Sequence, residues 1–355
     1  MQTHIANIEK FSSRKVIEGF FFLMGWVFKI LGELFLETCT AFGLLPSTTL
    51  YESRYEYKMT KRWEKLMHQA EALNKQRRPS EAVEIYEEAL QVAERTFGPE
   101  DLKILTSLNY LARILIDLGK HEEAESLYKR ALSICQKALG SEHPYLATIL
   151  NNLAVIYGAQ NKFEQAEHLY KQALTIREKI TGPDDLSLIT TLNNLSGLYK
   201  SWGEYEESES ILKRTLKICQ KNLRKYHTDM VTQLYKLAAL YRVQGKYAQC
   251  EALYLRVLTI VKKVHGINHA SVATALNFLA ASYYAQGKYE EIEPILEWAL
   301  TIFEKTLGPD HLEVAVVLEN LAALFQKFGR IEEARKLKRR AQKIRLKYPD
   351  RLLSQ

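Results

Sequence analysis

Four histidines with related spacings are the residues of this chain that most resemble a set of metal ligands. They are His143, His227, His269 and His311, and their separations are multiples of 42 residues. Imidazole nitrogens hold zinc only when several converge within about 2 Å of one ion. If each 42-residue unit is a layer of packed helices, equivalent side chains lie on the order of 10 Å apart. We therefore expect no metal site and assign these histidines a structural role near helix starts.

The sequence offers no other arrangement typical of catalysis. A glycine-rich phosphate loop, a His-Glu-x-x-His helix and a Gly-x-Ser-x-Gly elbow are all missing from it. The acidic run Glu204-Tyr205-Glu206-Glu207 fits a solvated helix surface. We predict that the protein is not an enzyme and uses no cofactor.

The cysteines are scattered rather than grouped. Cys39, Cys135, Cys219 and Cys250 have no metal-ligand spacing. Such scatter is typical of reduced, mostly buried thiols, so it favours a cytoplasmic protein.

A 42-residue repeat positions all of these residues except Cys39. Six blocks run without a gap from Phe97 to Tyr348. Fixed self-similarity at this period indicates a solenoid, in which each unit contacts only its neighbours. The clearest column of equivalent positions contains Leu108, Leu150, Leu192, Leu234, Leu276 and Leu318.

Each block predicts a helix hairpin. In the block Leu139–Ile180, Leu150, Leu153, Ala154 and Tyr157 follow the i, i+3, i+4, i+7 pattern of one helix face. A glycine, or Asn161 in this block, then marks the end of the first helix, where a left-handed residue is favoured. A second apolar helix follows. Neither helix can bury its apolar stripe alone, so we expect an all-α fold of stacked hairpins.

The pattern of the repeat resembles the tetratricopeptide repeat. The best match is Leu276 to Leu300, although Ile292 stands where alanine is usual. The 42-residue spacing, Thr-Leu-Asn-Asn-Leu at Thr191–Leu195 and Leu-Gly-Pro-Asp-His at Leu307–His311 are similar to the kinesin-light-chain variety. The resemblance implies a right-handed α-solenoid, a superhelix of about seven hairpins. The matching positions are Leu276, Leu279, Ala280, Tyr283, Gly287, Lys288, Tyr289, Ala299 and Leu300.

These patterns divide the chain into four parts. Residues 1–50 form a hydrophobic segment and linker, residues 51–96 a degenerate first repeat, residues 97–348 the six regular repeats, and residues 349–355 a tail. In the degenerate repeat, Ala82, Tyr86, Ala89 and Leu90 are in register with the second helix. The heptad-repeat domain of kinesin light chains is missing, so the resemblance implies a cargo-binding type of module rather than a motor subunit.

Helical geometry predicts a binding groove on the first helices. Positions that point away from the core include one column with asparagines and another with Gly197, Ala239, Ala281 and Ala323. Small residues leave room for another chain, and asparagine both donates to and accepts from a peptide backbone. The predicted groove residues are Asn109, Tyr110, Arg113, Asn151, Asn152, Asn193, Asn194, Lys200, Tyr235, Lys236, Arg242, Asn277, Phe278 and Asn320.

The resemblance implies a role for these residues. In tetratricopeptide proteins the first helices line the concave surface and asparagines hold peptides, a role that falls here on Asn152, Asn194 and Asn320. Lys200, Lys236 and Arg242 would favour acidic ligand residues. The alternative is that the asparagines cap or bridge adjacent helices and bind nothing else.

The charge of the chain is concentrated at its end. The net charge is +7, and residues Ile331–Gln355 hold nine basic and three acidic side chains. The last helix of a solenoid has no successor, so its outer face must be polar, as Lys338 and Gln342 indicate. We therefore do not expect nucleic-acid binding. An apolar content of 47% with 26% charged residues excludes a disordered chain.

The first fifty residues differ from the repeats. Val16–Leu36 is strongly apolar, but Lys29 and Glu33 each cost about 2.5–3 kcal/mol in a membrane, which makes a spanning helix marginal. A narrow polar stripe suits a helix in the membrane surface. Packing on the protein's own repeats and cleavage as a secretory signal remain alternatives. Residues Pro46–Tyr57 have the pattern of a linker.

Together these patterns predict a non-catalytic scaffold or adaptor. Its concave groove binds an extended, partly acidic segment of a partner protein, and it is cytoplasmic, with residues 16–45 as the place for any membrane attachment. The alternative is a membrane-tethered assembly factor or chaperone-like adaptor that acts through the hydrophobic segment. Partner, pathway and oligomeric state are not determined by the sequence.

Overall fold

The computed structural model describes residues 47–223 and 227–348. The hydrophobic segment Val16–Leu36 lies outside the described residues, so its membrane, self-packing and signal interpretations stay predictions. Among the helices within the described ranges, none is both long enough and apolar enough to cross a membrane.

The described part of the chain is helical throughout, as the repeat pattern predicts. Fourteen α-helices and two short 3₁₀ helices follow one another as hairpins within residues 47–223 and 227–348. They are α2 (Ser47–Lys75), α3 (Pro79–Thr96), α4 (Leu102–Asp117), α5 (His121–Leu139), α6 (Pro144–Ala159), α7 (Phe163–Thr181), η1 (Leu186–Leu188), α8 (Ile189–Trp202), α9 (Tyr205–Asn222), α10 (Thr228–Val243), α11 (Tyr247–His265), α12 (Ala270–Gln286), η2 (Tyr289–Glu291), α13 (Ile292–Leu307), α14 (Leu312–Lys327) and α15 (Ile331–Arg345).

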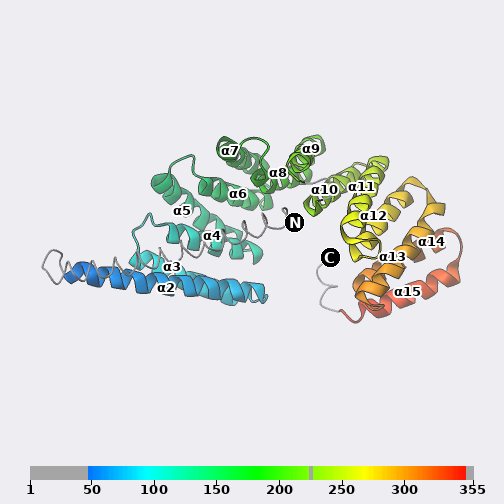
Figure 1. Ribbon diagram of the computed structural model, residues 1–355, viewed down its shortest axis with the longest axis horizontal. Helices are drawn as coiled ribbons and strands as arrows, with labels where there is room; N and C mark the ends of the chain where they lie inside the picture. Colours follow the sequence, from blue (N-terminus) through cyan, green and yellow to red (C-terminus); the bar gives the residue numbers. More distant parts are fainter. Residues whose placement is uncertain (1–46, 224–226, 349–355) are drawn as a thin grey trace, which may run out of the picture. The chain divides into compact units, whose positions relative to one another are not determined.

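The chain divides into two compact units. The first is Met1–Ala138 and the second is Leu139–Gln355. In the described part of the first unit, α2 and α3 form one hairpin, and α4 and α5 the next (Figure 1). The second unit contains five hairpins, from α6–α7 to α14–α15. We call the first helix of each hairpin the A helix and the second the B helix.

The leucine column of the repeat forms the core beneath each A helix. Its six members expose between 0% and 5% of their surface, and Leu276, for example, exposes 2%. Burying a leucine side chain contributes about 1.5–3 kcal/mol, so this one column is a large part of what holds each hairpin to its neighbours. One column of the B helices takes small residues at Ala124, Ala166 and Ser208, which are also buried.

The turn inside each hairpin requires a left-handed residue. Gly203 has φ 93° and Gly287 has φ 76°, and both cap the A helix that precedes them. Asn161 takes the same conformation at φ 60°, which asparagine tolerates better than other residues with a side chain. The glycine column therefore predicted these helix ends correctly.

The histidine column caps the A helices. His143 Nδ1 accepts a hydrogen bond from the backbone N–H of Tyr145 at 3.2 Å, and His227, His269 and His311 repeat this contact at the same distance. Asp185 makes the corresponding contact with the N–H of Ser187 at 2.8 Å. The imidazole therefore satisfies a backbone donor at the helix start, which confirms the structural role predicted for the four histidines.

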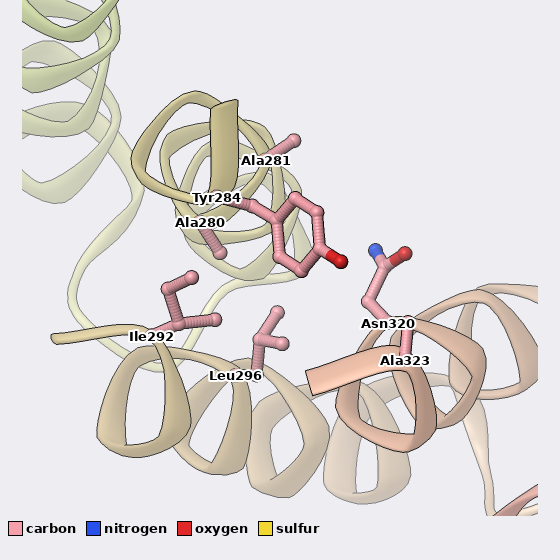
Figure 2. Close-up of a pocket in the computed structure, with 7 residues that line it drawn as sticks. All are labelled: Ala280, Ala281, Tyr284, Ile292, Leu296, Asn320 and Ala323. Carbon is pink, nitrogen blue, oxygen red and sulfur yellow. The ribbon is translucent and has the colours of Figure 1, made fainter. Parts of the chain in front are cut away.

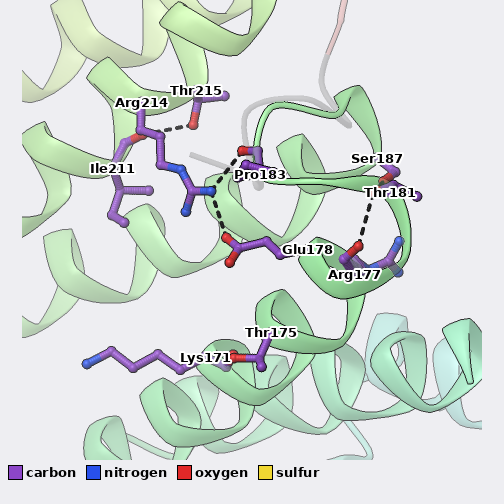
Figure 3. Close-up of polar contacts among 10 residues, drawn as sticks. All are labelled: Lys171, Thr175, Arg177, Glu178, Thr181, Pro183, Ser187, Ile211, Arg214 and Thr215. Carbon is purple, nitrogen blue, oxygen red and sulfur yellow. Dashed lines mark hydrogen bonds and ion pairs between the residues drawn. The ribbon is translucent and has the colours of Figure 1, made fainter. Parts of the chain in front are cut away.

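Polar contacts join successive B helices and the loop between them. Arg214 on α9 donates to Glu178 on α7 at 2.7 Å and to the carbonyl oxygen of Pro183 at 2.9 Å (Figure 3). Arg340, three repeats later, makes the same pair of contacts with Glu304 and the carbonyl oxygen of Pro309. These contacts fix one hairpin against the next.

The structure corrects the prediction of a linker before the first repeat. Helix α2 begins at Ser47, so residues 47–57 are helical rather than irregular. No glycine or proline interrupts the chain between Ser47 and Lys75, and the helix therefore continues outward from the packed hairpin (Figure 1). Leu66, Met67 and Ala70 are buried, as expected for its packing face.

The end of the second unit is polar, as predicted. Lys338 and Gln342 on α15 are exposed, at columns where earlier repeats bury Tyr170 and Leu174. A final helix without a successor needs this change because water covers its outer side.

Candidate functional site

The predicted groove residues lie on the A helices in both units. In the first unit, Asn109, Tyr110 and Arg113 are on α4. The Arg113 guanidinium lies 5.0 Å from the centre of the Tyr110 ring, and Tyr110 stacks on Tyr86 of α3 at 5.7 Å. The other predicted residues lie on α6, α8, α10 and α12, with Asn320 on α14. We call the surface of these five A helices of the second unit the A-helix face.

Between α6 and α8 the asparagines bond one another. Asn194 Nδ2 donates to Asn151 Oδ1 at 3.2 Å, and Asn151 Nδ2 donates to Asn152 Oδ1 at 3.1 Å. Asn151 is only 6% exposed, so part of its role is to bridge the two helices. A side-chain amide has two donors and two acceptor sites, and the half-buried Asn194 keeps its oxygen available to a ligand.

The junction of α8 and α10 lacks this bridge. Lys236 occupies the position that corresponds to Asn194, and it is exposed. Asn193 corresponds to Asn151, but its Oδ1 is buried and has no hydrogen-bond partner among the described residues. An unsatisfied buried acceptor is costly unless some donor reaches it. Among the described residues, this junction therefore has no donor that satisfies the Asn193 oxygen.

Aromatic rings close the junction of α10 and α12. The Tyr235 ring lies 5.2 Å from Phe278, which in turn stacks on Tyr254 of α11 at 5.6 Å. Burial raises the pKa of Tyr235 and raises that of Tyr254 to about 12, although the charge of Arg242 opposes the second rise. Both phenols therefore remain neutral donors at physiological pH. Phe278 is 42% exposed and offers an apolar contact on the A-helix face.

A pocket lies beside these rings, and we call it the polar pocket because Arg242, Asn277 and Ser282 add polar side chains to an otherwise mostly apolar lining. Its volume is about 140 Å³. It takes Arg242 from α10 and Asn277 from α12, both predicted groove residues, together with Ser282 from α12. The remaining lining residues are Tyr247, Cys250, Tyr254, Phe278 and Ala281.

A larger, mostly apolar pocket lies between α12, α13 and α14. Its volume is about 250 Å³. Figure 2 shows Ile292 and Leu296 at its base on α13, with the Tyr284 hydroxyl directed toward the Asn320 amide across it. Ala280, Ala281 and Ala323 supply the rest of the lining. Ala281 and Ala323, two members of the outward alanine column, thus border this space.

Cations on the A-helix face are unpaired. Lys200, Lys236 and Arg242 are exposed, and within residues 47–223 and 227–348 no carboxylate forms an ion pair with any of the three. Unpaired cations over a set of pockets favour an anionic ligand.

The sequence missed the parts of the pockets that lie under the A helices. Ile292, Leu296 and Tyr254 have the pattern of B-helix core residues, and they do pack in the core while lining a pocket. Ser282 carried a usable signal, because a serine stands there in a column that is otherwise Ile or Leu. The chain fold, rather than any local motif, brings these residues together with Arg242 and Asn320.

A family model described as the tetratricopeptide repeat matches residues 64–132, 103–179, 165–221, 229–305 and 271–347. The chain belongs to the tetratricopeptide-repeat family. Repeats of this family generally act as scaffolds for protein–protein interaction and are typically non-catalytic, although some relatives are parts of larger enzymes. A comparison with curated proteins gives no match.

Solved structures similar to this chain include kinesin-light-chain-like repeats. The TPR-like repeats of a candidate kinesin light chain from Podosopora anserina are 28% identical, with a TM-score of 0.52 over 59% of this chain and 98% of that one. BtubC from P. vanneervenii is 22% identical, with a TM-score of 0.53 over 64% of this chain and 91% of that one. The latter shows likeness of fold alone.

A third structure covers more of the chain. The tetratricopeptide-repeat sensor protein of the STAND ATPase class from Pyrococcus horikoshii has a TM-score of 0.62 over 86% of this chain and 45% of that one. Its identity of 17% shows the fold alone. The three likenesses support the tetratricopeptide solenoid, and the first supports its kinesin-light-chain-like repeat type.

Proposed function

We propose that the protein is a scaffold or adaptor that binds an extended, partly acidic segment of a partner protein along the A-helix face. The observation that carries this proposal is the set of unpaired cations, Lys200, Lys236 and Arg242, which lies on the same face as both pockets. Charge-assisted hydrogen bonds from Arg and Lys to carboxylates are roughly twice as strong as neutral ones. An acidic segment would therefore gain affinity and orientation there.

The missing asparagine bridge between α8 and α10 supports an extended ligand. Asn193 Oδ1 is a buried acceptor without a donor in the described part of the chain, and a peptide backbone supplies N–H donors at regular intervals. Asn194 and Asn320 each use an amide nitrogen to bridge to the preceding A helix. Their oxygens then face the same set of backbone donors. The asparagines thus support the fold and bind ligand at once.

The test is affinity capture with the full chain and with a variant that carries Lys200→Glu, Lys236→Glu and Arg242→Glu. We expect partners captured by the natural chain to be lost by the variant. The matched control reverses three exposed lysines on B helices, Lys217, Lys305 and Lys343, and so changes the net charge equally. Partners retained by both variants, or lost from both, would contradict the proposal.

A further inference from the structure

One buried position breaks the pattern of the repeats. Ser282 is 5% exposed, and its hydroxyl has no hydrogen-bond partner among the described residues. An aliphatic side chain in its place would leave no polar group unsatisfied. The equivalent buried residues of the other repeats are Ile114, Ile156, Leu198, Leu240 and Leu324. Ser282 is among the residues that line the polar pocket, and a ligand there would supply the partner that its hydroxyl lacks among the described residues.

The polar pocket presents several hydrogen-bond donors, among them Arg242, Asn277 and Ser282. Arg242 contributes an unpaired guanidinium, and Ser282 contributes its hydroxyl. The Asn277 oxygen already accepts from Asn320 at 2.7 Å, which leaves the Asn277 amide nitrogen as a further donor. No Asp or Glu lines this pocket. A carboxylate, which only accepts hydrogen bonds, matches this set of donors.

The apolar pocket adjoins the polar one on the same helix. Ala281 lines both pockets, and the Asn277–Asn320 hydrogen bond connects a residue of one with a residue of the other. Ile292, Leu296 and Tyr284 give the second pocket an apolar base and side. A large apolar side chain of the same ligand would fill this apolar pocket (Figure 2). The ligand's backbone would then pass over Ala281, which lines both pockets.

The pitch of the repeats sets the spacing of the two ligand residues. One pocket uses α10 and α12 and the other uses α12 and α14, so they are offset by one repeat. Packed helices lie about 8–10 Å apart. A polyproline II segment rises about 3.1 Å per residue with three residues per turn, so residues i and i+3 share a face at about 9.3 Å.

We propose that α10–α14 recognise a carboxylate side chain and a large apolar side chain placed three residues apart in an extended segment. The carboxylate binds Arg242, Ser282 and Asn277, and the apolar side chain binds between Tyr284, Ile292 and Leu296. This inference rests on the proposed function and specifies which residues of a partner this end of the A-helix face reads.

The probe is a set of fluorescein-labelled, acetylated and amidated peptides in a proline and alanine background. Each contains one Glu and one Leu, separated by one to five positions and in both orders, and binding to the full chain is measured by fluorescence anisotropy. We expect the peptide with i and i+3 spacing to bind at least tenfold more tightly than its neighbours in the series. Its versions with Gln for Glu or Ala for Leu should each lose about tenfold. Binding that ignores spacing would overturn the inference.

Variants of the protein test separately which ligand side chain each pocket binds. Ser282→Leu introduces the residue that other repeats carry, and Arg242→Gln removes the charge. Each should abolish the preference for Glu over Gln and leave the preference for Leu over Ala. Ala281→Trp should abolish both preferences, whereas Ala285→Trp, an exposed alanine on the same helix that lines neither pocket, should change nothing. An unchanged Glu preference in Ser282→Leu and Arg242→Gln would refute the carboxylate assignment.

Two further outcomes separate this inference from the proposed function. If peptide spacing has no effect while reversal of Lys200, Lys236 and Arg242 still abolishes partner capture, the scaffold proposal stands and the two-pocket inference fails. If a phosphoserine peptide binds more than tenfold better than the Glu peptide, the carboxylate assignment is wrong.

Discussion

Two sets of cations in the second unit differ in what they contact. Lys246, Lys288 and Arg330 follow the hairpin turns, and each pairs with a glutamate of the preceding repeat, Glu209, Glu251 or Glu293, at 2.6–2.9 Å. We call these three the turn cations. Lys200, Lys236 and Arg242 on the A-helix face have no such partner among the described residues. The same repeats thus neutralise one column of cations and leave the three cations of the A-helix face, which come from two other columns, unpaired.

The pairing of the turn cations has electrostatic consequences. Burial by itself raises the pKa of Glu209, but hydrogen bonds from Lys213, Lys246 and Tyr241 outweigh it and lower that pKa to about 2. The hydrogen bond that Lys288 donates to Glu251 raises the pKa of Lys288. The turn cations therefore hold successive repeats together, whereas the cations of the A-helix face are available for a ligand.

The largest effect on partner binding is expected for the unpaired cations of the A-helix face. Reversing Lys200, Lys236 and Arg242 to Glu should weaken binding of the captured partner at least a hundredfold, or about 3 kcal/mol, because attraction becomes repulsion at three contacts. Titration calorimetry gives the affinity. The urea midpoint should stay unchanged, since none of the three side chains forms an ion pair within the described residues. A fall in the midpoint as large as that caused by reversing the turn cations would contradict the distinction between the two sets.

The next largest effect is expected on stability, when a glutamate that pairs with a turn cation is neutralised. Glu209→Gln should lower the free energy of unfolding at pH 7 by about 1–2 kcal/mol and leave partner affinity unchanged. Because the folded pKa lies below the ordinary value of 4.5, the stabilisation is present above pH 4.5. It is lost as the pH falls toward 2. Urea unfolding of both proteins across this window measures the difference.

Its control is Glu206→Gln, an exposed carboxylate on the same helix. This variant should show no pH-dependent difference. An equal effect in both variants would mean that general charge, rather than the pairing of Glu209, controls the stability.

A smaller effect is expected at the helix caps. His311→Ala should lower stability by about 1 kcal/mol, because the backbone N–H of Glu313 loses the acceptor that it now contacts at 3.2 Å. His311→Asp should retain the stability of the natural chain, since Asp101 and Asp185 already fill this role in other repeats. Thermal unfolding distinguishes the two variants, and equal melting temperatures for His311→Ala and the natural chain would contradict the cap.

The smallest effect separates two asparagines of one column. Asn151→Ala breaks two hydrogen bonds and should cost about 1 kcal/mol in stability. Asn193→Ala removes an acceptor that has no partner in the described residues and should cost about 0.3 kcal/mol or less, while it weakens partner binding. Urea midpoints and partner affinities of the two variants give the comparison; the reverse order of stabilities would show that Asn193 has a structural partner.

Periodic features of the fold were predictable because they repeat. A leucine at every 42nd position can serve one purpose only, and the structure buries Leu234 and Leu318 completely. The glycine column predicted left-handed turns for the same reason, and the position of the histidines before four of the A helices predicted a structural role. The predicted linker failed because α2 lacks a breaker after Ser47.

The site was less predictable than the fold. Outward geometry placed Arg242, Asn277, Phe278 and Asn320 on one face, and the structure brings them to two pockets. Outward geometry did not show that Asn151 would be buried or that Asn277 would bond Asn320. The reason is that the distance between two A helices depends on how the hairpins stack. Whether these residues bind a peptide stays a prediction.

What the sequence determined by itself was the repeated unit: its two helices, its turn, its capped start and the apolar stripe that must be covered by a neighbour. These depend on contacts within one repeat or on a column that all repeats share. Which polar groups remain without partners within the described residues, as with Ser282, Asn193 and Arg242, depends on the tertiary structure. That outcome depends on side chains from two or three different repeats meeting at one place, and no single repeat contains the information.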